Sequence, residues 1–295
     1  MAEIGWEELW ERARQLLELG ERLTRESAVR RSAGSPSPHD EDRVQAYRWR
    51  GGALDPIPHP DLYPREGLLE VEASLDRLIL NLAAFVAGRP ALDVLLYGER
   101  GTGKSTAVRV ALGLLGSEGL RLVEVAREDL LELPRLFALL RDRPGRYVLF
   151  CDDLSFGEGD PSYRALKSVL DGGVEARPAH VLVVATSNRR HLIPERKSEN
   201  RDVTHGPDGE LHLSETSEEK LSLSDRFGLL LPFFGFDQAA YLRIVDYHAA
   251  RVGLASRLPE PELHARALRF ALERASRSGR TARQACVAIL QELAS

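Results

Sequence analysis

Hydrophobic positions recur with two different periods along this chain of 295 residues. Between about residues 67 and 236, short apolar runs alternate with amphipathic helical patterns. The runs are DVLLYG, LRLVEVA, RYVLFCDD, HVLVVATSN and LLLPFFGF. Apolar strands that alternate with helices are typical of a parallel sheet covered on both faces. We therefore expect an α/β domain at 67–236 in which helices flank a parallel five-stranded sheet.

The pattern changes on either side of this domain. From Asp237 onward it is purely helical and predicts a small helical domain at 237–295. Residues 1–31 carry an amphipathic stripe that predicts one helix, packed on the protein's own core or, alternatively, docked on a partner. Residues 32–66 hold six of the chain's 16 prolines and predict a linker with neither regular helix nor central strand.

Composition and charge are those of an ordinary soluble globular protein. Apolar residues make up 43% and charged residues 29% of the chain, and the net charge of −5 does not favour nucleic acid as a general partner. Cys151 and Cys286 have no metal-ligand spacing and suit a reducing compartment. The N-terminus lacks a signal-peptide pattern, and no segment approaches the roughly 18 apolar residues of a membrane span. We expect a cytoplasmic protein that does not contact a membrane.

The stretch YGERGTGKST at 97–106 satisfies the pattern G-x-x-x-x-G-K-[ST] between a predicted strand and a predicted helix. Glycines let backbone N–H groups curl around phosphate oxygens, and the helix N-terminus adds positive charge. Lys104 is expected to reach the β- and γ-phosphates, and Ser105 to offer its hydroxyl to Mg²⁺. A glycine turn that merely begins a helix is the simpler alternative. The residues assigned to nucleotide binding are Gly98, Glu99, Arg100, Gly101, Thr102, Gly103, Lys104, Ser105 and Thr106.

Two carboxylates follow the third apolar run. Asp152 and Asp153 stand at the expected carboxyl end of a sheet strand, beside the phosphate loop. This position suits a carboxylate pair that holds a metal ion and polarises water. We assign Asp152, with Ser105, to Mg²⁺ and Asp153 to the attacking water. The alternative is that both acids simply begin a loop, where Asp is common.

Five segments in order, GERGTGKST, LFCDDLS, VVATSNRR, LSDRFG and SGRTARQA, resemble the AAA+ ATPases. CDDLSF, EGDPSYRALKS, ATSNRRHL and SLSDRFG more narrowly resemble the bacterial AAA+ family grouped as domain of unknown function 815, over roughly residues 67–290. The resemblance implies a P-loop NTPase (AAA+) fold in which the C-terminal helical domain is a lid. It also implies ATP as the nucleotide, hydrolysis of ATP, and self-association into a ring or other oligomer.

The resemblance implies three further site residues. Asn188 would be a first sensor that contacts the γ-phosphate and the water, and Arg226 an arginine finger that reaches the neighbouring subunit's ATP. Arg280 would be a second sensor in the lid, with Arg283 as the less favoured candidate. The expected catalytic residues are therefore Lys104, Asp153, Asn188 and Arg226.

Two departures from the family pattern bear on function. Asp153 stands where the family usually has Glu, which is one methylene longer, so either the attacking water sits closer to the strand or hydrolysis is slow. No aromatic-apolar-Gly pore loop follows the second strand, which argues against threading of a polypeptide. The polar segment 190–224 predicts a hairpin for subunit or partner contacts, with a metal site at His205 and His212 as the disfavoured alternative.

The sequence predicts an oligomeric, Mg²⁺-dependent ATPase that remodels or loads a macromolecular partner, either a protein or a nucleic acid. One alternative is an ATP-dependent switch or scaffold with little hydrolysis. Another is a small-molecule phosphotransferase, which is disfavoured because no acceptor-binding lid of basic residues is apparent.

Overall fold

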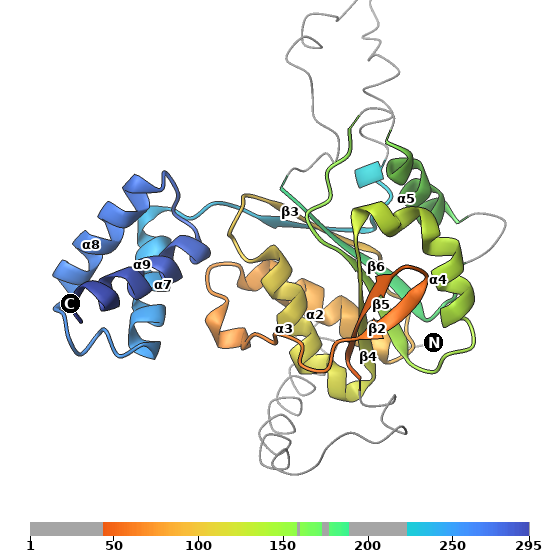
Figure 1. The fold of residues 1–295 in the computed structure, drawn as a ribbon, viewed down its shortest axis with the longest axis horizontal. Coiled ribbons are helices and arrows are strands. Elements are labelled where there is room, and N and C mark those ends of the chain that lie inside the picture. Colours follow the sequence, from red (N-terminus) through yellow and green to blue (C-terminus); the bar gives the residue numbers. More distant parts are fainter. Residues whose placement is uncertain (1–43, 158–159, 173–176, 189–222, 295) are drawn as a thin grey trace, which may run out of the picture.

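The computed structural model describes residues 44–157, 160–172, 177–188 and 223–294 (Figure 1). The N-terminal helix and the hairpin expected from the sequence lie outside these residues. No helix in the described part of the chain is long and apolar enough to cross a bilayer.

One twisted sheet organises the α/β domain. In the described residues it has seven strands in the order β2-β1-β4-β5-β6-β3-β7. Every neighbouring pair is parallel except β1 and β2, which are antiparallel. The strands are β1 Ala46–Arg50, β2 Ala53–Pro56, β3 Val94–Gly98, β4 Leu120–Val125, β5 Arg146–Cys151, β6 Val181–Ser187 and β7 Leu229–Phe233.

The expected number of five strands is wrong, because β1 and β2 extend the sheet beyond β4. Both lie in the segment for which the sequence predicts a linker, so that expectation does not hold for residues 46–56. Tyr47 and Trp49 are buried while Arg48 and Arg50 are exposed, which is the alternation of a strand with one face in the core. Pro56 ends the edge strand β2, where a missing N–H is tolerated.

Helices cover both faces of the sheet (Figure 1). On one face, α2 (Glu72–Val86) and α3 (Lys104–Leu115) enclose an apolar layer with β3, β4, β6 and β7. On the other face, α4 (Leu133–Leu140) and α5 (Pro161–Asp171) enclose a second layer, which includes Trp49. In the described residues the domain also has three short 3₁₀ turns, η2 Arg65–Gly67, η3 Gly116–Glu118 and η4 Arg127–Glu132.

The C-terminal helical domain, for which we keep the name lid, contains α7 (Gln238–Arg251), α8 (Glu260–Glu273) and α9 (Gly279–Glu292), to the left in Figure 1. Its core contains many small residues, so the three helices pack closely. Side-chain caps begin α7 and α9, since Asp237 accepts from Ala240 N and Ser278 accepts from Thr281 N. The expected architecture is confirmed: an α/β domain whose mostly parallel sheet is flanked by helices is followed by a small C-terminal helical domain.

Replacement of Trp49 by Ala tests whether β1 belongs to the core. The indole is fully buried, so its removal should destabilise the protein by about 3–5 kcal/mol. The measurement is the urea midpoint of unfolding. Leu272→Ala is the control, because Leu272 is 81% exposed and should change stability by less than about 0.5 kcal/mol. Equal midpoints for the two variants would mean that residues 46–50 are not part of the folded core.

Candidate functional site

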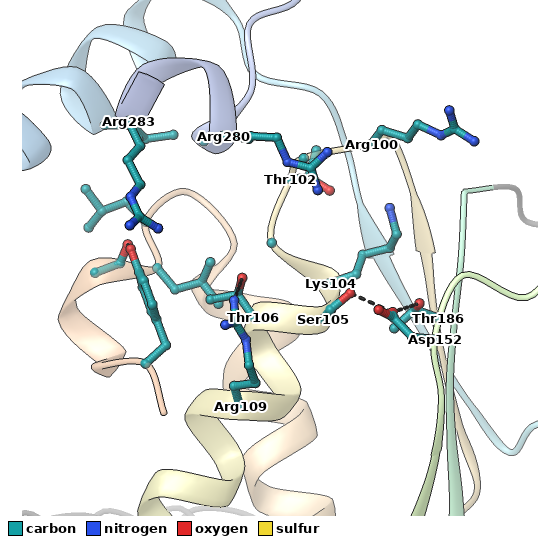
Figure 2. A pocket seen from close by; sticks show the side chains of 18 of the residues that line it. Arg100, Thr102, Lys104, Ser105, Thr106, Arg109, Asp152, Thr186, Arg280 and Arg283 are labelled. Atoms are coloured by element: carbon teal, nitrogen blue, oxygen red, sulfur yellow. Dashed lines mark hydrogen bonds between the residues drawn. The ribbon is translucent and has the colours of Figure 1, made fainter. Parts of the chain in front are cut away.

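A cavity of about 730 Å³ lies where the α/β domain meets the lid (Figure 2). It is lined by the loop between β3 and α3, by residues at the carboxyl ends of β5 and β6, and by residues of α7 and α9. Ligands of open parallel sheets bind outside the carboxyl ends of the strands. The position and the size of the cavity therefore suit a nucleotide.

The loop between β3 and α3 curls at its glycines. Gly101 and Gly103 have left-handed φ angles of 76° and 106°, and α3 begins directly afterwards at Lys104. Thr102 Oγ1 donates a hydrogen bond to Glu99 O at 2.8 Å, which closes the turn. A glycine-rich turn that leads into a helix N-terminus is a binding site for anions. The local geometry is thus that of a phosphate loop.

Most residues assigned to nucleotide binding line the cavity, namely residues 100–106. Gly98 and Glu99 are not among the described lining residues, and they contribute through their carbonyl oxygens. These oxygens accept hydrogen bonds from Lys104 Nζ at 2.8 and 2.6 Å. A third hydrogen bond joins Lys104 Nζ to Asn188 Oδ1 at 3.0 Å. The ammonium group is therefore fixed between the loop and the end of β6.

Burial lowers the pKa of Lys104, whose residue surface is 7% exposed. The nearby carboxylates of Asp153 and Asp152 act in the opposite direction, since they favour the charged form. Negative phosphate oxygens would favour the charged ammonium in the same way. The electrostatics of the loop are thus suited to a bound polyanion.

The acidic pair is held by hydrogen bonds from two neighbouring elements. Asp152 Oδ1 accepts from Ser105 Oγ and from Thr186 Oγ1, both at 2.6 Å (Figure 2). Asp153 N donates to Thr186 Oγ1 at 2.8 Å, and Asp153 Oδ1 accepts from Asn188 Nδ2. Asp153 has a φ of 51°, a left-handed conformation in which Asp is enriched. The expected metal residues and the expected first sensor therefore meet at one place.

The oxygen atoms gathered here fit Mg²⁺. Ser105 Oγ and Asp152 Oδ1 are hard donors of the kind that Mg²⁺ prefers. Within the described ranges, no three His, Cys, Asp or Glu side chains gather into a metal site. A protein that binds Mg²⁺ together with a nucleotide needs only one or two ligands of its own, because phosphates and waters supply the others.

Two arginines of the lid reach the cavity. Arg280 extends from the beginning of α9 toward the phosphate loop, and Arg283, one turn further along α9, lines the same cavity (Figure 2). The lid also touches the loop through its backbone, because Gly279 N donates to Gly101 O at 3.0 Å. The sequence favoured Arg280 over Arg283, whereas the structure places both on the cavity wall.

Part of the cavity wall is apolar, and the sequence analysis did not identify it. Tyr63, Leu68 and Leu69 come from the segment before α2, while Phe236 precedes α7 and Ile244 lies within it. Flat aromatic and aliphatic side chains of this kind suit a nucleobase. No sequence signal distinguishes them from ordinary core residues, because the wall forms only when two distant segments meet.

Arg226 lies apart from the other assigned residues. It is absent from the described residues that line the cavity, and its Nε donates to Asp171 Oδ1 at the end of α5. The structure of one chain therefore does not bring Arg226 to that chain's own phosphate loop. A role of Arg226 in a neighbouring subunit's site stays a prediction.

Comparisons with known proteins complete this description. The family model described as "Protein of unknown function (DUF815)" matches residues 42–293. A search of curated proteins finds no match. Among solved structures, the Thermotoga maritima RuvB Holliday junction branch migration motor is 16% identical with a TM-score of 0.44, over 76% of this chain and 71% of that one. The Aeropyrum pernix ORC1 protein in complex with DNA is 18% identical with a TM-score of 0.42, over 78% and 66%.

The contact between the loop and the lid can be tested with Gly101→Ala. A Cβ at this position would lie 2.7 Å from Ser278 Oγ at a left-handed φ of 76°. We expect nucleotide affinity to fall about tenfold or more, measured by titration with a fluorescent ATP analogue. Gly119→Ala is the control, because its φ is 108° but its Cβ would have nothing within 4 Å. Identical affinities in the two variants would contradict the proposed importance of this contact.

Proposed function

The chain belongs to the DUF815 family, and we propose that it is a Mg²⁺-dependent ATPase of AAA+ type that works as an oligomer. One observation carries the proposal. The phosphate loop, the Ser105–Asp152 pair and the Asp153–Asn188 pair all face one cavity. The triphosphate would lie on the loop, and the base against the apolar wall.

Binding of the triphosphate would rest on charge. Lys104 would neutralise the β- and γ-phosphates, and Arg280 would contact the γ-phosphate from the lid. Ser105 and Asp152 would hold Mg²⁺, which supplies positive charge next to the phosphoryl oxygens. Because phosphoryl transfer needs little covalent help from the protein, positioning and neutralisation provide most of the catalysis.

Hydrolysis would require a water molecule in line with the bond to be broken. Asp153 is the carboxylate available for this water, and its orientation depends on the hydrogen bond from Asn188 Nδ2 to its Oδ1. Asn188 also accepts from Lys104, so one amide would link the water to the phosphate-binding ammonium. This connection supports the assignment of Asn188 as the first sensor.

The location of Arg226 favours an oligomer. This arginine is absent from the described lining of its own cavity, so an arginine-finger role would require the cavity of an adjacent subunit. An arginine finger increases nucleotide hydrolysis by about 10³–10⁵ in related systems. The complete active site would therefore form only between subunits.

The same contacts would convert hydrolysis into movement. Gly279 N donates to Gly101 O, and Arg280 follows directly in α9, so loss of the γ-phosphate would alter what holds the lid to the loop. A lid that changes position can displace or release whatever is bound to it. This coupling supports a role in which the oligomer remodels or loads a protein or nucleic-acid partner.

A second candidate is an ATP-dependent switch with little hydrolysis. Asp153 is shorter than Glu, has a left-handed backbone and is bonded to Asn188, all of which limit its reach toward a water molecule. In such a protein, ATP binding by itself would set the position of the lid. Turnover measurements separate the two candidates.

Specific activity should increase with protein concentration. If the site is completed by a neighbour, phosphate release per chain should rise several-fold across the range in which light scattering shows assembly. A concentration-independent turnover would contradict the shared site. Tight ATP binding with negligible turnover at every concentration would favour the switch.

Arg226→Ala should bind nucleotide with affinity within about twofold of the natural chain, yet hydrolyse it about 10³-fold more slowly. Lys104→Ala, by contrast, should lose binding. Mixing the two inactive variants should restore part of the activity. In a mixed oligomer, a Lys104→Ala subunit can supply its Arg226 to the nucleotide bound by an adjacent Arg226→Ala subunit. Absence of any recovery in verified mixed oligomers would argue that Arg226 does not act between subunits.

A further inference from the structure

Thr186 lies next to both residues of the acidic pair, although no motif in the sequence predicts a role for it. It lies near the carboxyl end of β6 and is 1% exposed. Its hydroxyl has two hydrogen-bond partners, and both belong to the acidic pair. Oγ1 donates to Asp152 Oδ1 at 2.6 Å and accepts from Asp153 N at 2.8 Å. Figure 2 shows Asp152 between Ser105 and Thr186.

We infer that Thr186 is a positioning residue that orients both members of the acidic pair and thereby increases the affinity of the site for a Mg²⁺-bound nucleotide. This inference rests on the proposed function. It concerns how the chain prepares the carboxylates, whereas the proposal above concerns what they do once the nucleotide is bound.

The donor and acceptor groups of a hydroxyl determine the direction of both Thr186 hydrogen bonds. A threonine has one O–H to donate and lone pairs to accept. Because Asp153 N can only donate, the threonine oxygen must accept there, and its single hydrogen is free for Asp152. The hydroxyl crosses from β6 to the end of β5, where it bonds one carboxylate and one backbone amide.

The consequence for Asp152 is preorganisation. Its Oδ1 receives two O–H donors, Ser105 from α3 and Thr186 from β6, so the carboxylate is held from two sides. A ligand that is already oriented loses less conformational freedom when a metal ion binds. With Thr186 removed, Ser105 alone would hold the carboxylate.

The consequence for Asp153 concerns its backbone. The φ of 51° is uncommon for a residue other than Gly and needs support from its surroundings. The hydrogen bond from Asp153 N to Thr186 provides that support, and a backbone bond from Leu154 N to Thr186 O at 2.8 Å continues it. Thr186 therefore connects the carboxylate assigned to the metal ion with the backbone of Asp153, the residue assigned to water.

The test compares Thr186→Val, which keeps the shape and removes the hydroxyl, with Thr186→Ser, which keeps the hydroxyl. The affinity for a fluorescent ATP analogue is measured with Mg²⁺ and again in EDTA, and the ratio gives the gain in affinity due to Mg²⁺. We expect this gain to fall about tenfold in the Val variant and to be largely recovered in the Ser variant. Affinity in EDTA should change less than about twofold.

Two further variants separate positioning from general stability. Ser187→Ala removes the neighbouring buried hydroxyl, which donates a hydrogen bond to Leu154 O and not to the acidic pair's carboxylates, and should leave the gain due to Mg²⁺ unchanged. Thr186→Ala should lose the same gain in affinity due to Mg²⁺ as Thr186→Val. Agreement between the two variants would show that poor folding of one of them does not cause the loss. Thermal unfolding of each variant is recorded in parallel.

The outcomes are distinct. The inference is overturned if the gain in affinity due to Mg²⁺ is unaltered in both Thr186→Val and Thr186→Ala. It is also overturned if these variants lose affinity equally with Mg²⁺ and in EDTA. If the natural chain binds the analogue no better with Mg²⁺ than in EDTA, the proposed function fails and this inference fails with it.

Discussion

A buried ammonium group is the constraint around which the site is built. Removing a positive charge from water is costly unless hydrogen bonds compensate for the lost hydration. Lys104 has three such bonds, to two loop carbonyls and to Asn188 Oδ1. They can form only if the end of β3 lies next to the end of β6. The strand order β6-β3-β7 places these two strand ends side by side. The sheet topology is therefore what allows the Lys104 ammonium to be buried with its hydrogen bonds satisfied.

Two of the polar contacts that join the lid to the α/β domain differ in character. One is the backbone hydrogen bond from Gly279 N to Gly101 O, inside the site. The other is an ion pair in which Arg243 Nε and Nη2 reach the two oxygens of Glu70 at 2.5 and 2.9 Å. The hydrogen bond from Arg243 lowers the pKa of Glu70. Because Arg243 is largely exposed, the pair orients the lid more than it stabilises the fold.

Strands β1 and β2, which the sequence did not predict, move the edge of the sheet from β4 to β2. Without them β4 would end the sheet and expose unpaired backbone groups, which invite association with other strands. β1 covers that edge in parallel and β2 closes it with a short antiparallel strand. Arg48 Nε of β1 also donates to Glu124 Oε2 at 2.8 Å, and Glu124 lines the cavity. The extension thus contacts the wall of the site as well as the edge of the sheet.

By itself, the sequence determined the features that depend on local spacing. The phosphate loop, the acidic pair after a buried strand, and the alternation of strands with helices all have short-range patterns that physical chemistry makes recognisable. The sequence did not predict the strand at Trp49, because the prolines of residues 32–66 favoured a linker there. Only the tertiary structure decided that Thr186 bonds the carboxylate of Asp152 and the backbone amide of Asp153, and that Tyr63 and Ile244 share a cavity wall. These contacts join segments far apart in the chain, and strand order and the docking of the lid, which no local pattern encodes, bring them together.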